Sequence, residues 1–124
     1  MSTVIIQNTI FIFQLIACHL IGDYVLQVDY IARTKGENKY HLFVHCFLYT
    51  VPFAYLFSRS FYHMPYVFIL TTIIFISHWS IDALKCRTPS RINYLQDQVF
   101  HYIVLLLIDI DYLYTILSVV GCKI

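Results

Sequence analysis

Histidine and aspartate residues recur in pairs four positions apart along this 124-residue sequence. The pairs are His19 and Asp23, His41 and His45, His78 and Asp82, and Asp97 and His101. Residues four apart lie on one face of a helix with Cβ atoms about 6 Å apart, so both side chains can reach one ion. Imidazole and carboxylate groups together suit divalent transition metals. The spacing therefore predicts a metal site, provided that helices bring the pairs together.

The composition indicates that these helices lie in lipid. Hydrophobic residues make up 60% of the chain and charged residues only 12%, against roughly 25% charged in an ordinary soluble domain. Such a surface is too apolar to stay dispersed in water. The net charge is only +1 and the basic residues form no stripe, which excludes a nucleic-acid binder. The predicted partner is the lipid bilayer.

Four segments have the length and polarity of transmembrane helices, because crossing about 30 Å of hydrocarbon takes about 20 mostly apolar residues. The predicted spans cover residues 4–22, 42–58, 64–82 and 94–120. Asp109 and Asp111 divide the last span, so it is complete only if both acids are sheltered. Three spans with an interfacial tail are the alternative. We expect an all-α polytopic membrane protein, a four-transmembrane-helix bundle that forms a single domain over residues 1–124.

The basic residues indicate how this bundle is oriented. The first and third predicted loops hold six Lys and Arg residues, whereas the opposite side holds only Arg59 and Lys123. The positive-inside rule then puts these two loops in the cytoplasm and both termini outside, in a membrane expected to be the bacterial inner membrane. Helix direction follows, and all four pairs fall at the cytoplasmic end. The deeper members are His19, His45, His78 and His101, and the shallower are Asp23, His41, Asp82 and Asp97.

The four pairs also form an internal repeat. The first predicted hairpin carries His-x-x-x-Asp and then His-x-x-x-His, and the second carries His-x-x-x-Asp and then Asp-x-x-x-His. Two similar hairpins packed about an axis along the membrane normal would make a pseudo-twofold bundle.

Charge balance favours a metal at the predicted site. An unpaired charge at the bilayer centre costs roughly 2.5–3.5 kcal/mol, so three aspartates need compensation, which the four positive charges of two divalent cations would supply. We expect one or two ions. Zinc is the first choice, and manganese, iron and nickel are alternatives. The predicted ligands are His19, Asp23, His45, His78, Asp82, Asp97 and His101. His41 lies closest to a loop, His63 lies outside the pairs and is expected to be solvated, and a metal-free hydrogen-bond network stays open.

Several blocks of the sequence resemble a small bacterial and phage family of integral-membrane proteins of unknown function. They are His19-Leu-Ile-Gly-Asp23-Tyr-Val-Leu-Gln27, the segment around His45, Ser77-His78-Trp-Ser-Ile-Asp82 and Leu95-Gln-Asp97-Gln98-Val-Phe-His101. The resemblance covers about residues 15–107. The chain is also distantly similar to membrane-bound metal-dependent hydrolases. This second resemblance implies hydrolysis of a lipid-like or amphiphilic substrate.

For hydrolysis, a carboxylate that is spared from ligation must handle protons, and the candidate catalytic residues are Asp97 and Asp23. Asp97 is preferred because it is shallow, lies near a helix N-terminus and precedes Gln98. Two alternatives use the same residues: a non-catalytic assembly or effector protein with a structural metal, and a proton or metal transport component. A homo-oligomer also stays open. The four cysteines form no Cys-x-x-Cys motif and are expected to be reduced thiols.

Overall fold

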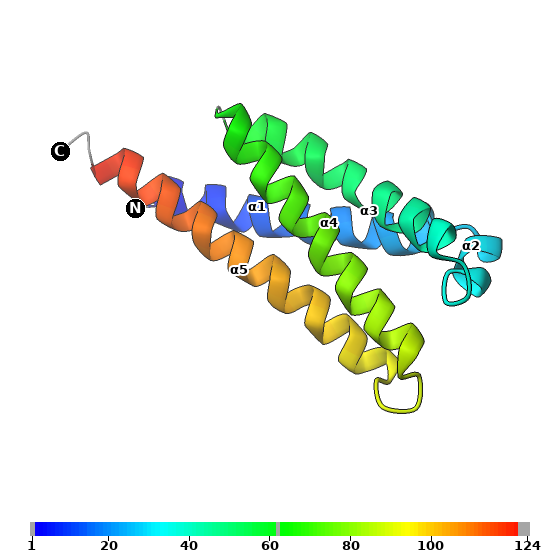
Figure 1. Cartoon of the computed structure of the whole chain (residues 1–124). Helices are drawn as coiled ribbons and strands as arrows, with labels where there is room; N and C mark the ends of the chain where they lie inside the picture. The colour runs from blue at the N-terminus through cyan, green and yellow to red at the C-terminus, as the bar shows by residue number, and fades with distance from the viewer. Residues whose placement is uncertain (1, 62, 122–124) are drawn as a thin grey trace.

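The computed structural model describes residues 2–61 and 63–121, and helices form nearly all of it (Figure 1). The long helices are α1 (Ser2–Leu20), continued by the π-helical turn η1 (Ile21–Val25), α3 (Lys39–Ser60), α4 (Met64–Arg87) and α5 (Tyr94–Gly121). Taken with η1 as a continuation of α1, all four are long and apolar enough to cross a membrane. The all-α prediction is confirmed, and each predicted span lies within one of these helices.

The first connection differs from the prediction, whereas the last helix agrees with it. The first connection, predicted to be a loop, contains the short helix α2 (Asp29–Thr34), whose acidic first turn and basic last turn complement the helix dipole. Helix α5 runs unbroken through Asp109 and Asp111. Asp109 accepts a hydrogen bond from Asn8 of α1 (Nδ2 to Oδ2, 3.2 Å), and Asp111 accepts one from the Tyr66 hydroxyl of α4. Neighbouring helices therefore shelter both acids, as a complete fourth span requires.

Local sequence sets the starts of two helices. Asn38 precedes α3, and its side-chain oxygen accepts hydrogen bonds from the backbone N–H groups of Tyr40 and His41 (2.9 and 3.4 Å). This is the usual N-cap arrangement, which satisfies N–H groups that have no partner inside the helix. Pro65 lies in the first turn of α4, where its missing N–H is not needed. The connection between α3 and α4 is short, and the two helices pack side by side in opposite directions (Figure 1).

The four long helices form a ring in which α1 and α4 each pack against both α3 and α5. Both described ends of the chain lie at one end of the bundle, and α2 lies at the other with the α4–α5 connection (Figure 1). The apolar core fills the half nearer the chain ends and includes Phe11, Leu15, Phe53, Phe57, Phe61, Ile74 and Ile108. Between this core and the end with α2, each long helix places one histidine in the bundle interior.

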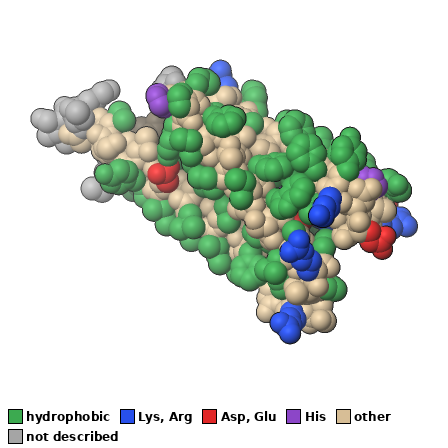
Figure 2. Space-filling model, viewed as in Figure 1, with side chains coloured by type: hydrophobic (Ala, Val, Ile, Leu, Met, Phe, Trp, Pro, Cys, Tyr) green, Lys and Arg blue, Asp and Glu red, His purple; other side chains and the backbone are tan. Residues whose placement is uncertain are grey.

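The outside of the bundle is strongly apolar. Large hydrophobic side chains face outward along every long helix, among them Phe13 at 68%, Phe68 at 73% and Leu107 at 61% exposure. Figure 2 shows hydrophobic side chains over much of the visible face, whereas most visible Lys and Arg side chains gather toward the end with α2. Lys123 and the fourth cysteine, Cys122, lie outside the described residues. Cys18, Cys46 and Cys86 are free thiols, as expected.

Candidate metal centre

Four histidines, one from each long helix, meet inside the bundle. His19 of α1, His45 of α3, His78 of α4 and His101 of α5 are at most 3% exposed. The aspartates of the same pairs lie one helical turn nearer to the end with α2. The bundle interior therefore holds four histidines and, nearer to α2, the three aspartates Asp23, Asp82 and Asp97.

Five of these side chains form two groups with a spacing suited to a metal ion. Asp23, His45 and His78 form the first group, and His78, Asp82 and His101 form the second. Within each group, one potential ligand atom of every residue lies within 4.8 Å of the others. His78 belongs to both groups, since its Nε2 is 2.9 Å from His45 Nε2 and its Nδ1 is 3.3 Å from His101 Nδ1. Two imidazole nitrogens this close must share a proton or a cation.

The carboxylates link the two groups. Asp82 Oδ2 lies 3.2 Å from His45 Nε2, and its Oδ1 lies 3.7 Å from His101 Nε2. Asp23 Oδ1 lies 3.4 Å from His45 Nε2 and 3.6 Å from His78 Nε2. These imidazole nitrogens and carboxylate oxygens are suitable ligands for one or two divalent transition metals.

Unsatisfied polar atoms also point to an additional group at this site. Among the described residues, the buried atoms His101 Nε2 and Asp97 Oδ1 have no hydrogen-bond partner. They lie 3.8 Å apart on successive turns of α5. A buried polar atom without a partner costs about 1–3 kcal/mol, so a bound ion or water is expected there.

His19 and Asp97 lie beside the two ligand groups, although they were predicted as ligands too. His19 Nε2 is 3.0 Å from Gln98 Oε1, and His19 Nδ1 is 2.9 Å from the Tyr49 hydroxyl. Because the amide oxygen only accepts, His19 donates from Nε2, and the neutral ring accepts the tyrosine proton at Nδ1. Asp97 Oδ2 instead accepts a hydrogen bond from Lys85 Nζ at 2.6 Å. Ligation by either residue stays a prediction.

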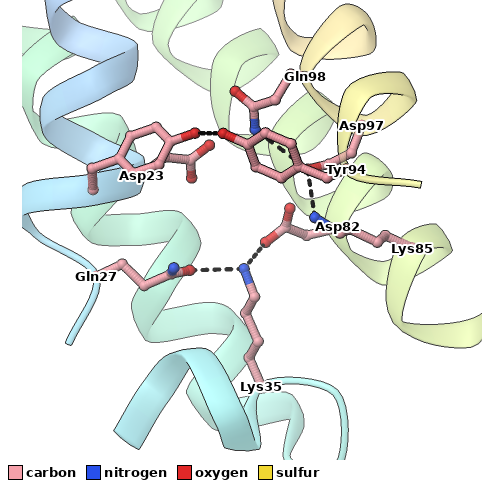
Figure 3. A pocket seen from close by; sticks show the side chains of 9 residues that line it. Asp23, Gln27, Lys35, Asp82, Lys85, Tyr94, Asp97 and Gln98 are labelled. Atoms are coloured by element: carbon pink, nitrogen blue, oxygen red, sulfur yellow. Dashed lines mark hydrogen bonds and ion pairs between the residues drawn. The ribbon is translucent and has the colours of Figure 1, made fainter. Parts of the chain in front are cut away.

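Two lysines change the charge argument made from the sequence. Lys35, the residue after α2, places Nζ 2.5 Å from Asp82 Oδ2 and 2.8 Å from Gln27 Oε1, and Lys85 of α4 pairs with Asp97 (Figure 3). The sequence argument assigned the charge balance of the three aspartates to metal ions alone. The structure corrects this, because two lysines already pair with two of the aspartates. With neutral histidines, two ammonium groups leave the three carboxylates with one net negative charge. One divalent cation would turn this into one net positive charge.

A polar pocket of about 80 Å³ opens above the carboxylates at the end of the bundle with α2 (Figure 3). Its volume is enough for roughly two water molecules. Asp23, Asp82 and Asp97 line it, and the hydroxyls of Tyr24 and Tyr94 are hydrogen-bonded to each other across it. The two tyrosines are 53% and 60% exposed, so the pocket reaches the surface beside them. The sequence analysis did not identify either tyrosine as part of the site.

Tyr49 is a buried site residue that sequence reasoning missed. Its ring stacks on His78, with centroids 3.5 Å apart and planes 6° apart, and its hydroxyl reaches His19. The signal in the sequence was its position four residues after His45, on the same face of α3. A Cβ at Gly22 would lie 2.5 Å from Tyr49 Cδ2, so only glycine allows η1 to approach α3 this closely. The π-helical turn, a feature often found at functional sites, then carries Asp23.

The remaining histidines lie elsewhere. His41 Nδ1 is hydrogen-bonded to Thr34 Oγ1 at 2.7 Å, and its ring packs edge-on against Tyr30. It therefore joins α3 to α2 and, unlike the other members of the four pairs, does not enter the cluster. His63 is exposed where α4 begins.

Comparison with known proteins identifies a family. None of the curated proteins and none of the solved structures matches the chain. The family described as "Protein of unknown function (DUF3307)" matches residues 10–121, which include most of α1, all of α3, α4 and α5, and the whole cluster from His19 to His101. The chain therefore belongs to the DUF3307 family.

Proposed function

We propose that this chain is an integral membrane protein that binds a divalent transition metal in its His and Asp cluster. One observation carries the proposal: two ligand groups that share His78 lie at the floor of a pocket open at one end of the bundle. The outward-facing hydrophobic side chains of all four long helices support membrane insertion. Zinc is our preferred metal, held chiefly by Asp23, His45, His78, Asp82 and His101.

The proposed orientation puts the pocket at the cytoplasmic face of the bacterial inner membrane, with both termini external. It is supported by the Lys and Arg side chains around α2 and the α4–α5 connection. A topology reporter fused after residue 124 should read external, and one inserted near Gly36 should read cytoplasmic. The opposite pair of results would overturn the orientation.

We further propose that the site hydrolyses an ester, amide or phosphate ester of an amphiphilic substrate. A divalent metal held there would supply a Lewis acid and make water a better nucleophile. In hydrolysis the water oxygen bonds to the carbonyl carbon or phosphorus, the bond to the leaving group breaks, and the leaving group takes a proton. The pocket opens at the end of the bundle, where the headgroup of an amphiphile would lie.

The chain has groups suited to the other parts of this reaction. Asp97 lies outside both ligand groups and its buried Oδ1 has no partner among the described residues, so it is our candidate for accepting the proton from water. Asp23, 12% exposed at its side chain, is the second candidate. Lys35 and Lys85 line the same pocket, and although each is paired with an aspartate, their positive charges would attract an anionic group of the substrate.

The first experiment is elemental analysis of the detergent-purified chain before and after chelation. We expect one or two transition-metal ions per chain, and less than about a tenth of an ion, with none regained on reloading, would overturn the proposal. The second compares hydrolysis of a panel of lipid phosphates, esters and amides by the parent chain and by Asp97→Asn. Asp97→Asn should retain the metal and the melting temperature but lose turnover. His63→Ala is the control and should retain all three.

A structural metal is the second candidate, because the two ligand groups join residues from η1, α3, α4 and α5. A metal there would tie all four long helices together. Chelation would then lower the melting temperature, and the parent chain would hydrolyse no member of the panel. A transport role is less well supported, because the aromatic core around Phe11, Phe53 and Phe57 fills the bundle beyond the cluster.

A further inference from the structure

A second cavity, of about 240 Å³, lies on the other side of Lys35, between the start of α3 and the end of α4. Its basic lining residues are Lys35, Lys39 and Arg87, and its apolar ones include Leu42 and Trp79. No Asp or Glu is among the described residues that line it. The pocket above the metal ligands is different, since three aspartates line that one.

The cations of this cavity are not equivalent. The ammonium of Lys35 is already engaged by Asp82 and Gln27. Lys39 and Arg87 are exposed, and no described carboxylate lies within the 4.0 Å of an ion pair from either of them. Two cations without a counterion at the rim of one cavity attract an anion.

An aromatic surface continues from this cavity along the outside of the bundle. The Trp79 ring lies 5.9 Å from the ring of Phe75 and 6.4 Å from that of Phe43, and the last two lie 5.8 Å apart. Phe43 is 44% exposed and Phe47, stacked beside it, is 55% exposed. The surface therefore faces away from the helix bundle, on the side of α3 and α4 that lipid would cover.

We propose that this cavity binds the phosphate headgroup of an anionic phospholipid, with Lys39 and Arg87 at the phosphate. An acyl chain would then lie against Phe43, Phe75 and Trp79. A basic cavity between helices at the cytoplasmic end of a bundle is suited to such headgroups, and the adjoining apolar surface distinguishes a lipid from a free anion. This inference rests on the proposed membrane insertion, but on neither the metal site nor hydrolysis.

The chain contains its own reporter, because Trp79 is its only tryptophan. The full chain in micelles of an uncharged detergent is titrated with phosphatidylglycerol carrying brominated acyl chains, with equally brominated phosphatidylcholine, and with inorganic phosphate. We expect phosphatidylglycerol to quench Trp79 emission saturably at low mole fraction. Phosphatidylcholine should quench weakly and without saturation. Inorganic phosphate at millimolar concentration should neither change the emission nor compete.

The charge of the cavity is tested by a matched pair of double variants. Each cation near an anionic lipid surface contributes roughly fivefold in affinity, so Lys39→Gln with Arg87→Gln should weaken phosphatidylglycerol binding roughly 30-fold. Arg33→Gln with Arg91→Gln removes the same charge from the same end of the bundle without changing a residue that lines the cavity, and should change binding less than about threefold. If the first double variant does not fold, the two single variants should each lose roughly fivefold.

Three results would overturn the inference: equal quenching by the two lipids, equal losses in the two double variants, or displacement of the lipid by inorganic phosphate. The last would indicate a site for free anions. Chelated chain and His78→Ala should bind phosphatidylglycerol like the parent, so a failed metal proposal leaves this result unchanged. Failure of membrane insertion shows separately, in the topology reporters near Gly36 and after residue 124.

Discussion

Aspartates that face the interior of the bundle have different neighbours in its two halves. Near α2, Asp23, Asp82 and Asp97 lie among histidines and lysines, with Lys35 at 2.5 Å from one carboxylate and Lys85 at 2.6 Å from another. In the other half, the donors to Asp109 and Asp111 among the described residues are neutral, namely the Asn8 amide and the Tyr66 hydroxyl. Helix α5 thus carries Asp97 beside a lysine and a histidine at one end, and the hydrogen-bonded Asp109 and Asp111 at the other.

This difference shows that an acid within a predicted span is no sign of a site by itself. A buried ionisable group needs compensation, and either a cation or a neutral donor can supply part of it. What distinguishes the α2 half is the meeting of several ligand groups from different helices at one place. If the halves are independent, variants near α2 should change metal binding, and variants in the other half should change stability without loss of metal.

The largest expected effect is on metal retention. His78→Ala removes the ring that both ligand groups share, and even changes outside the ligand shell weaken metal binding by about 10- to 100-fold. We therefore expect a loss of more than about 100-fold, measured by zinc titration and elemental analysis. Asp109→Asn, in the other half, should retain the parent's metal. If both variants keep it, the comparison between the halves fails.

Packing should matter most in the half without the cluster. Phe57 is fully buried in the aromatic core, so Phe57→Ala should lower the free energy of unfolding by about 3–5 kcal/mol while the folded chain keeps its metal. Denaturant unfolding in mixed micelles measures the change. Phe68→Ala is the matched control, because that ring is 73% exposed, and it should cost far less. Loss of metal in Phe57→Ala would show that the two halves are coupled.

A smaller effect is expected at the close contact between η1 and α3. Gly22→Ala adds a Cβ about 2.5 Å from Tyr49 Cδ2, which forces Tyr49 or η1 to shift and should cost about 1–3 kcal/mol. Metal affinity should fall as well, because Tyr49 stacks on His78. Gly121→Ala, where nothing lies within 4 Å, is the control in the same two assays. An unchanged Gly22→Ala chain would contradict this contact.

The smallest effect is expected from Tyr66→Phe, which removes the hydroxyl that donates to Asp111. One hydrogen bond contributes about 0.5–1.5 kcal/mol to folding, so melting in detergent should shift only slightly. Metal content should not change. A loss of metal here would mean that the sheltered acids of α5 support the cluster, contrary to the comparison.

Much of the fold follows from local features of the sequence. The length of each apolar segment determines a long helix, and the four-residue spacing places His19 with Asp23, or His78 with Asp82, on one helix face. Helix direction then brings the pairs to the same end of the bundle. These properties depend on single helices and on their order along the chain, so no knowledge of the packing is needed to predict them.

Only the tertiary structure decided which of these residues meet. It placed His78 between His45 and His101, engaged both ring nitrogens of His19 with Tyr49 and Gln98, and turned His41 toward α2. It also brought Lys35 and Lys85 onto the carboxylates, Lys35 from 47 positions away. Such contacts depend on the rotation and spacing of packed helices and on a π-helical turn that Gly22 permits. The pattern within any single helix does not encode them.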